Sequence, residues 1–446
     1  MNSISQTKQS KNNFLHRGEP WVWASGAALA FILVMIVLLL GVVVANGLPA
    51  FWPKDLIEAR LKDGSRVLGE IHRREINGDG VATVQFKVGN RDLLGLDFKW
   101  LSQPEIISES RPVDAVVLER REYGNFFGYL QKTDGAKAVF TDAAGRIKEI
   151  ALIDIIRSYR PNRMNLLDKT GLYATRLVEL LWDEPRESNT EGGLFPAIFG
   201  TVLMIFLMSI LSFPLGVIAG IYLREYAKPG ILVTMVRIAV NNLAGIPSIV
   251  YGIFGLGFFI YGMGGAIDQL FFPQNLPTPT FGTGGILWAS LTLGLLTVPV
   301  VIVSTEEALG AIPKGIREAS LACGATRYQT LTRLLLPMAS PGILTGFILA
   351  MARAAGEVAP LMITGVVKLA PTMPIDTSFP FFHLDRKFMH LGFHIYDIGF
   401  QSPNVEATKP MVYVTTLLLL LIVVLMTGTA IHLRNTMKKR YTLTDV

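Results

Sequence analysis

The sequence EEALGAIPKGIREASLACGATRYQTLTRLLLP, residues 306–337, decides how this chain is organised, because it is a polar segment between two strongly apolar runs. Pro313 stops any helix that enters the segment, and Pro337 opens the next helix, where a missing N–H group costs nothing. Small residues between them allow another backbone to approach closely, and Gly324 lets the chain turn away. We therefore predict a short, charged, amphipathic helix between two membrane spans. The simpler alternative is a solvated loop.

The rest of the chain has the composition of a membrane protein. Half of its 446 residues are hydrophobic and 17% are charged, and its mean hydropathy is +0.42. A helix needs about 20 apolar residues to cross a bilayer, because its backbone must form its hydrogen bonds without water. The sequence therefore predicts an all-α polytopic membrane protein whose last five spans form a core over residues 194–435. Six runs are long enough: 22–45, 196–223, 238–262, 285–304, 341–366 and 411–433.

Charges at the two ends predict the orientation. An even number of spans puts both ends on one side, and the positive-inside rule makes the basic side cytoplasmic. We therefore expect cytoplasmic tails over residues 1–21 and 436–446. The first span is followed by the bulky sequence ANGLPAFWP, so we expect a retained anchor and not a cleaved signal peptide. The basic residues at the ends are Lys8, Lys11, Arg17, Arg434, Lys438, Lys439 and Arg440.

Residues 46–193, between the first two spans, have the character of a soluble domain, and this orientation puts them in the periplasm. Short β-branched or aromatic segments alternate with turns that contain Gly, Asp or Asn, so we predict a small, mostly β insert domain. The tripeptide RRE occurs at 73–75 and again at 120–122, which suggests a duplicated hairpin. Leucines at helical spacing over 165–184 predict a final amphipathic helix, lying on the membrane surface or packed on the β domain.

The chain has no pattern typical of an enzyme. It contains no phosphate-binding loop, catalytic triad or zinc-protease motif. Its one cysteine, Cys323, has no neighbouring cysteine or histidine, so we expect it to pack among small residues. His390 and His394 have a metal-binding spacing for a helix, but the sequence around them is typical of a turn-rich loop. We therefore predict no catalytic residue, no cofactor and no metal site.

The spacing within the polar segment resembles the EAA loop of bacterial ABC-importer permeases. Glu318, Ala319 and Gly324 match its first, second and seventh positions, and the segment ends in Pro337 as the loop does, although Ser320 replaces a second alanine. In that family the loop is a cytoplasmic helix that docks onto the ATP-hydrolysing subunit and transmits its motion to the membrane helices. The resemblance implies a type I importer permease fold. It also implies that these residues couple to an ATPase: Arg317, Glu318, Ala319, Ser320, Gly324, Ala325 and Pro337.

Three further segments resemble the PstA-type permeases of phosphate ABC importers: GGLFPAIFGTVLM at 192–204, NNLAGIPSIVYGIFGL at 241–256 and ILTGFILAMARAAGEVAPLMITG at 343–365. The resemblance leaves the insert domain aside. It implies the non-catalytic permease subunit of an ATP-driven phosphate importer in the bacterial inner membrane. The implied partners are a PstC-type permease, a PstB-type ATPase dimer and a PstS-type periplasmic phosphate-binding protein. There are two alternatives. The chain is a permease for another oxyanion, or it is a membrane sensor or scaffold that signals through the external domain.

The predicted fifth span differs from the other five because it contains charged residues, Arg353 and Glu357. Four residues apart, they can pair on one helix face, and the cost of a charge in lipid predicts that both face the bundle interior or an aqueous path. Either they form a buried ion pair that fixes helix packing, or Arg353 binds a passing phosphate while Glu357 keeps it from binding too tightly. Asn242 and Ser248 are candidates for the same path, although such residues more often join helices.

Overall fold

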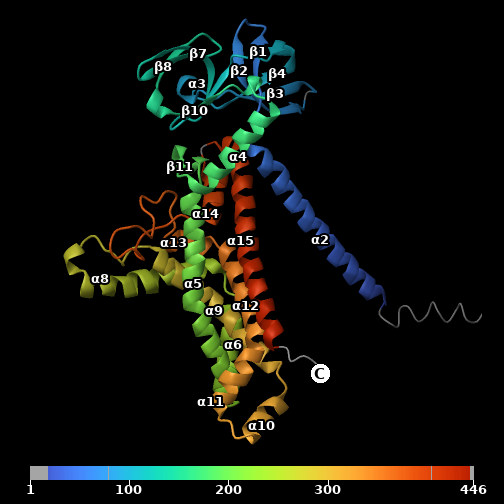
Figure 1. Ribbon diagram of the computed structural model, residues 1–446, viewed down its shortest axis with the longest axis vertical. Coiled ribbons are helices and arrows are strands. Elements are labelled where there is room, and N and C mark those ends of the chain that lie inside the picture. Colours follow the sequence, from blue (N-terminus) through green and yellow to red (C-terminus); the bar gives the residue numbers. More distant parts are fainter. Residues whose placement is uncertain (1–18, 79, 403, 442–446) are drawn as a thin grey trace, which may run out of the picture.

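The computed structural model describes residues 19–78, 80–402 and 404–441, so most of the predicted tail 1–21 and the end of the tail 436–446 lie outside the described residues. The molecule is elongated and has three parts (Figure 1). A β domain forms one end, long helices form the middle, and the polar loop 306–337 forms the opposite end. We call these two ends of the helix bundle the domain end and the loop end.

The described residues contain six helices that are long and apolar enough to cross a membrane, which confirms the predicted number. They cover Pro20–Phe51, Phe195–Tyr226, Ser248–Phe271, Ile286–Gly310, Arg327–Gly356 and Val405–Lys439. Their α-helical parts include α2 (Glu19–Gly47), α5 (Phe195–Ile221), α7 (Ser248–Phe254), α9 (Ile286–Gly310), α12 (Leu336–Gly356) and α15 (Val405–Tyr441). Shorter helices are α6 (Ile231–Leu243), α8 (Gly265–Phe271), α10 (Lys314–Ala322), α11 (Arg327–Thr330), α13 (Ala359–Thr364) and α14 (Leu391–Tyr396). Segments of π-helix occur at Tyr222–Tyr226, Gly255–Gly264, Leu331–Leu335 and Asp397–Gln401.

The third span begins at Ser248 and not, as the sequence predicted, at residue 238. The apolar run 238–262 is interrupted by a turn at residues 244–247, where Pro247 adopts the extended ψ of 135°. Residues before the turn form the separate helix α6, and those after it continue through a π-helix into α8. The prediction was therefore wrong in placing Asn242 on the same transmembrane helix as Ser248.

The predicted fifth span, 341–366, was wrong at both ends. Its helix runs from α11 through a π-helix into α12, so Pro337 lies inside a continuous helix and does not open it. The wider π-turn, in which Leu336 N–H donates to Leu331 O, accommodates a residue without an N–H group. At the other end α12 stops at Gly356, because Glu357 has the extended dihedrals φ −79° and ψ 129°.

Small residues let the long helices approach closely. α9 packs between α5 and α12. A β-carbon added at Gly220 of α5 would lie 2.7 Å from Thr305 Cβ of α9, and one added at Gly346 of α12 would lie 2.2 Å from Ser304 Cβ. Contacts of this kind hold helices together in lipid, where water provides no hydrophobic driving force between them.

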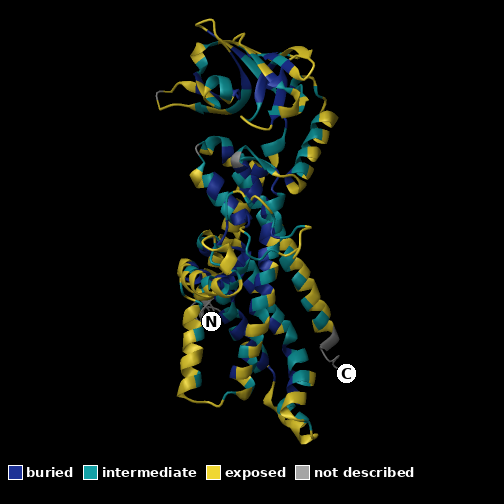
Figure 2. Ribbon diagram, turned by 90° about the vertical axis from the view of Figure 1, so that its left-hand side faces the viewer, coloured by how far each residue is buried: buried dark blue, intermediate teal, exposed yellow. Residues whose placement is uncertain are grey.

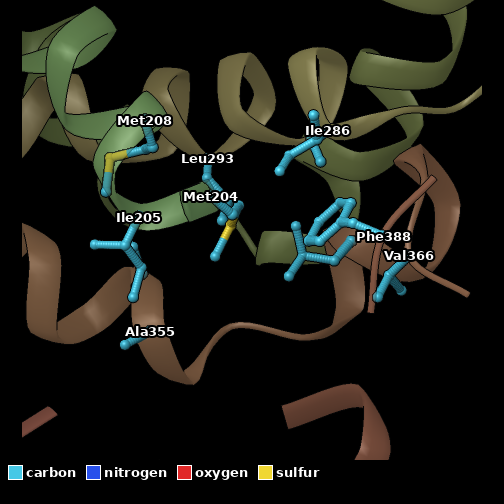
Figure 3. Packing of buried hydrophobic residues seen from close by; sticks show 11 residues of the cluster. Met204, Ile205, Met208, Ile286, Leu293, Ala355, Val366 and Phe388 are labelled. Atoms are coloured by element: carbon cyan, nitrogen blue, oxygen red, sulfur yellow. The ribbon is translucent and has the colours of Figure 1, made fainter. Parts of the chain in front are cut away.

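A hydrophobic cluster fills the space where α5, α9 and α12 meet at the middle of the bundle (Figure 3). Its members are Met204, Ile205, Met208, Ile286, Ala289, Leu293, Ala354, Ala355, Leu361, Val366 and Phe388. Val366 and Phe388 come from the connection between the last two spans, so this connection is part of the core. Buried residues continue along the centre of the bundle, whereas the tip of the loop end is mostly exposed (Figure 2).

Two five-stranded antiparallel sheets form the β domain, which confirms the predicted β insert. The first sheet has the strand order β4-β3-β2-β1-β5, and the second has the order β9-β8-β7-β6-β10. Each sheet has its own buried core. The strands are β1 (Leu56–Leu61), β2 (Arg66–Ile76), β3 (Ala82–Lys87), β4 (Phe98–Ser102), β5 (Ile106–Ser110), β6 (Val116–Arg120), β7 (Phe126–Asp134), β8 (Lys137–Thr141), β9 (Ile147–Ala151) and β10 (Ile155–Tyr159). A short helix, α3 (Arg91–Leu94), precedes β4, and a ribbon of β11 (Pro185–Arg186) and β12 (Glu191–Gly192) leads to α5.

The two sheets repeat one design. In each, four strands form a meander, a 3-10 turn follows, and the last strand pairs with the first. The second strand of each has a bulge that begins two residues after a glycine, at Gly69 in β2 and at Gly128 in β7. A β-carbon added at either glycine would lie 2.4 or 2.5 Å from a carbonyl oxygen of the neighbouring strand. The two sheets of the β domain therefore form an internal structural repeat.

This repeat is not the one that the RRE tripeptides suggested. The first tripeptide lies in β2, whereas the second covers the end of β6 and the turn after it. The equivalent of β2 in the second sheet is β7, so the two tripeptides occupy unrelated positions. The RRE tripeptides therefore do not mark the repeat.

The chain enters and leaves the β domain at one place. The predicted amphipathic helix is α4 (Leu166–Trp182), which follows the last strand. Arg176 of α4 donates to Phe51 O at 2.7 Å, and Tyr173 OH donates to Leu48 O at 2.9 Å, so α4 is clamped to the segment that enters the domain. Arg176 also pairs with Glu119 of β6. These contacts support the packed placement of α4.

Candidate functional site

The polar loop forms an ordered projection at the loop end. As predicted, α10 begins after Pro313, and Gly324 follows it with a φ of +86°, a conformation that favours glycine. Thr326 then caps α11: its Oγ1 accepts from Gln329 N at 3.2 Å, and Gln329 Oε1 accepts from Thr326 N at 2.9 Å. The loop is thus two short helices joined by a defined turn.

Arg317 fixes α10 to two membrane spans. Its guanidinium donates to the Glu225 carboxylate at 2.7 and 3.3 Å, and to Leu309 O and Ile312 O at 2.7 Å each. Glu225 belongs to the end of the second span and Leu309 to α9. The Arg317 side chain is only 19% exposed. Arg317, which the resemblance assigned to ATPase coupling, therefore faces its own chain.

The remaining coupling candidates divide into two groups. Glu318 and Ala319 are exposed on α10 and are available to a partner. Ser320 faces inward, because its Oγ lies 2.9 Å from Thr330 Oγ1 of α11. Gly324 supplies the turn, and Ala325 is half-buried beside it. Together with Pro337 inside the fifth span, these last residues shape the loop.

A second ion pair braces the same end and was not predicted. Arg237 of α6 lies 3.1 Å from Glu306 at the end of α9 and donates to Leu223 O of the second span at 2.9 Å. Its partner lies 69 residues away in the sequence, so no local pattern indicates the pair.

Arg353 and Glu357 form the predicted pair, although not on one helix. Arg353 lies in the last turn of α12, Glu357 lies just beyond the end of α12, and Nε and Oε1 are 3.5 Å apart. Their side chains are 38% and 20% exposed. The pair is therefore open on one side, and an open pair contributes little to stability.

Among the described residues, no hydrogen bond or ion pair joins the other two predicted path residues to this pair. Asn242 is exposed on α6, and Ser248 is partly buried at the start of α7. α6 and α7 are joined instead by Tyr251, whose hydroxyl donates to Leu243 O at 2.7 Å.

His390 and His394 lie at a short helix, where the sequence predicted a turn-rich loop. His390 Nδ1 accepts from Gly392 N at 3.1 Å and caps α14, while His394 Nδ1 lies 2.7 Å from Asn189 Nδ2. Burial lowers the pKa of both imidazoles to about 4, so they are neutral at neutral pH. Within the described residues, no group of three or more His, Cys, Asp or Glu side chains could hold a metal ion.

The bundle matches a known family of transport proteins. The family model for the binding-protein-dependent transport system inner membrane component matches residues 212–439, just over half of the chain. This range begins within α5 and reaches nearly to the end of α15, and it excludes the β domain.

Several named permeases are similar to the chain. The probable ABC transporter permease proteins YqgH and YqgI of Bacillus subtilis (strain 168) are 33% and 32% identical to it over 204 and 224 residues. These alignments cover 45% and 48% of this chain, and 62% and 70% of the relatives. The phosphate transport system permease protein PstA of Yersinia pestis is 36% identical over 182 residues, which are 41% of this chain and 56% of that protein.

A solved structure of the MetNI methionine ABC transporter, in inward-facing conformations, covers 55% of this chain and 95% of its own, with 21% sequence identity and a TM-score of 0.41. The family model and the curated relatives carry the assignment. The chain is therefore an ABC-transporter permease that belongs to the family of binding-protein-dependent transport system inner membrane components.

Proposed function

We propose that this chain is the transmembrane permease subunit of an ATP-driven phosphate importer. The observation that carries the proposal is α10, a helix held rigidly to spans two and four by Arg317 while Glu318 and Ala319 remain exposed. Such a helix is suited to receive a push from a partner and to pass it to the membrane helices. Phosphate is proposed as the cargo because several relatives are named PstA phosphate permeases.

The proposed assembly contains a PstC-type permease, a PstB-type ATPase dimer and a PstS-type phosphate-binding protein. ATP hydrolysis belongs to the ATPase, and this chain forms half of the translocation path. Closure of the ATPase pair moves α10, and Arg317 and Arg237 carry that motion into the second and fourth spans and α6. The loaded binding protein delivers phosphate when the cavity opens outward, and hydrolysis resets the cavity inward.

The proposed orientation has both termini and α10 in the cytoplasm and the β domain in the periplasm. The positions of the β domain and α10 at opposite ends of the molecule support it (Figure 1). Cys323, which is exposed and is the one cysteine of the chain, provides the test. A membrane-impermeant maleimide should label Cys323 in inside-out vesicles and not in intact spheroplasts. Labelling from the outside would contradict this orientation.

We place Arg353 in the phosphate path, with Glu357 as the group that limits how tightly phosphate binds. Arg353→Gln should lower phosphate uptake by about tenfold or more, because an interaction with a charged group is worth roughly 1.5–3 kcal/mol. Glu357→Gln should lower the maximal rate and also the KM, because phosphate then leaves more slowly. Both are measured as radiolabelled uptake by the assembled complex.

Co-purification of the ATPase with each variant shows that the complex has assembled. Arg60→Gln, which changes an exposed arginine of β1, is the control and should leave uptake unchanged. Unchanged uptake in both Arg353→Gln and Glu357→Gln would remove the pair from the path. Uptake of another oxyanion by the wild-type complex, without phosphate uptake, would replace phosphate as the cargo. Intact phosphate uptake after deletion of the gene would favour a sensor or scaffold.

A further inference from the structure

A cavity of about 430 Å³ lies where the β domain meets the domain end of the bundle. Glu70 and Lys87 of the first sheet line it, as does Tyr159 of the second. The ends of α2 and α15, the helix α4 and the ribbon β11–β12 complete its wall. Its volume is typical of a site for a small ligand. None of the residues that we assign to transport lines it.

Two pairs of oppositely charged side chains line this cavity, and neither pair forms a salt bridge. Glu70 of β2 and Lys87 of β3 are cross-strand partners, as are Arg186 of β11 and Glu191 of β12. Cross-strand side chains are close enough to interact. However, the described part of the chain has no N···O distance of 4.0 Å or less within either pair. Two cations and two carboxylates therefore share one cavity while lacking a hydrogen-bond partner from the described residues.

Of the other charged groups at the cavity, Lys54 is exposed and has no ion-pair partner among the described residues, whereas the arginines of β6 and α4 are already paired. Arg176 pairs with Glu119, and Arg120 donates to both carboxylate oxygens of Asp92 at 3.1 Å. Burial raises the pKa of the Glu191 carboxyl group, and this side chain is partly buried in the cavity wall. An unpaired charge in such a place costs free energy. A ligand that pairs with these groups would therefore bind favourably.

We propose that this cavity binds hydrogenphosphate, whose anionic oxygens accept from Lys87 and Arg186 and whose own O–H group donates to Glu191. Ammonium and guanidinium groups are the usual partners of phosphate oxygens. A carboxylate repels a fully ionised oxyanion but accepts a hydrogen bond from one that keeps a proton. Sulfate and phosphodiesters have no proton to donate at neutral pH, so the site selects phosphate over sulfate.

The same chemistry has two sources: free inorganic phosphate, or the phosphomonoester headgroup of phosphatidate in the membrane beside α2 and α15. In either case the ligand contacts the β domain and the ribbon that leads into α5. It therefore connects the β domain to the bundle outside the transport path. Through this site the permease would respond to phosphate that is bound at the β domain, as distinct from the phosphate that it transports.

The test uses the purified full-length chain in lipid-free detergent, without the binding protein, and equilibrium dialysis against radiolabelled inorganic phosphate. Lys87→Gln and Arg186→Gln should each raise the Kd about tenfold or more, whereas Lys87→Arg should retain binding and so report a correct fold. Lys99→Gln is the matched control, because Lys99 lies on β4 next to Phe98 and points to the opposite face. Arg353→Gln removes phosphate binding in the proposed transport path, so the binding that depends on Lys87 should persist in this variant, which separates this site from the transport path.

Sulfate should compete poorly with phosphate in the wild-type chain and well in Glu191→Gln. A second arm reconstitutes the chain with phosphatidate and measures the retained lipid by mass spectrometry. Retained phosphatidate that is lost in Lys87→Gln supports the site with a lipid source, even if free phosphate does not bind. The proposal is overturned if neither ligand binds in a Lys87-dependent way, or if sulfate competes equally well with wild-type protein.

Discussion

Replacement of Arg317 with alanine should abolish ATP-coupled phosphate uptake while leaving the helix bundle assembled. The change removes four hydrogen bonds and leaves the mostly buried Glu225 carboxylate without its partner. The expected cost is about 3 kcal/mol, and it falls on the attachment of α10, because the partners of Arg317 lie at the loop end. A loosened α10 can still bind the ATPase but cannot move the spans. ATP hydrolysis should therefore continue without transport.

The measurement compares phosphate uptake with ATP hydrolysis in proteoliposomes that contain the whole complex. Arg317→Lys keeps the charge opposite Glu225 but cannot also reach both carbonyl oxygens, so it should have intermediate uptake. Arg60→Ala, at an exposed arginine of the β domain, is the matched control and should behave as wild type. Full coupled uptake by Arg317→Ala would show that α10 does not need this anchor.

Gly346→Ala should lower the thermal stability of the bundle far more than one methyl group suggests. The added β-carbon would lie 1.8 Å from Ser304 Oγ and 2.2 Å from Ser304 Cβ. Rotation of the serine side chain can move its Oγ but not its Cβ, so α9 and α12 must separate. Overpacking of this kind costs about 1–3 kcal/mol or more. We expect a clear fall in the Tm of the detergent-solubilised protein.

The double variant Gly346→Ala with Ser304→Gly restores the space and should recover most of the lost Tm. Gly428→Ala in α15 is the control, because a β-carbon there meets no atom within 4 Å and helical alanine is slightly favoured over glycine. If Gly346→Ala and Gly428→Ala unfold at the same temperature, the close contact between α9 and α12 does not limit stability.

The sequence predicted those features that depend on local composition. Apolar length identified all six spans, and alternating segments with turn residues identified the β domain. Pro313 and Gly324 marked the start and the end of α10 correctly, because each acts on its own backbone. The break at the end of the fifth span was missed, although the sequence Gly356–Pro360 contains typical helix-ending signals.

Features that depend on distant residues could not be predicted in this way. Arg317 and Glu225 are 92 residues apart, and only the packing of α10 against the second span brings them together. The resemblance implied that Arg317 couples to the ATPase, whereas the hydrogen bonds of its side chain are all to residues of its own chain. The repeat in the β domain was also hidden, because the two sheets share strand order and bulge position and few identical residues.

The clamp between α4 and the segment that enters the β domain has an evolutionary consequence. Phe51 and Arg176 are in contact, so the chain leaves the bundle and returns to it at nearly the same point. A domain whose two ends meet can be gained, doubled or lost without displacing the helices around it. The geometry of this junction therefore allows the β domain to be inserted or removed as one unit without moving the helices of the bundle.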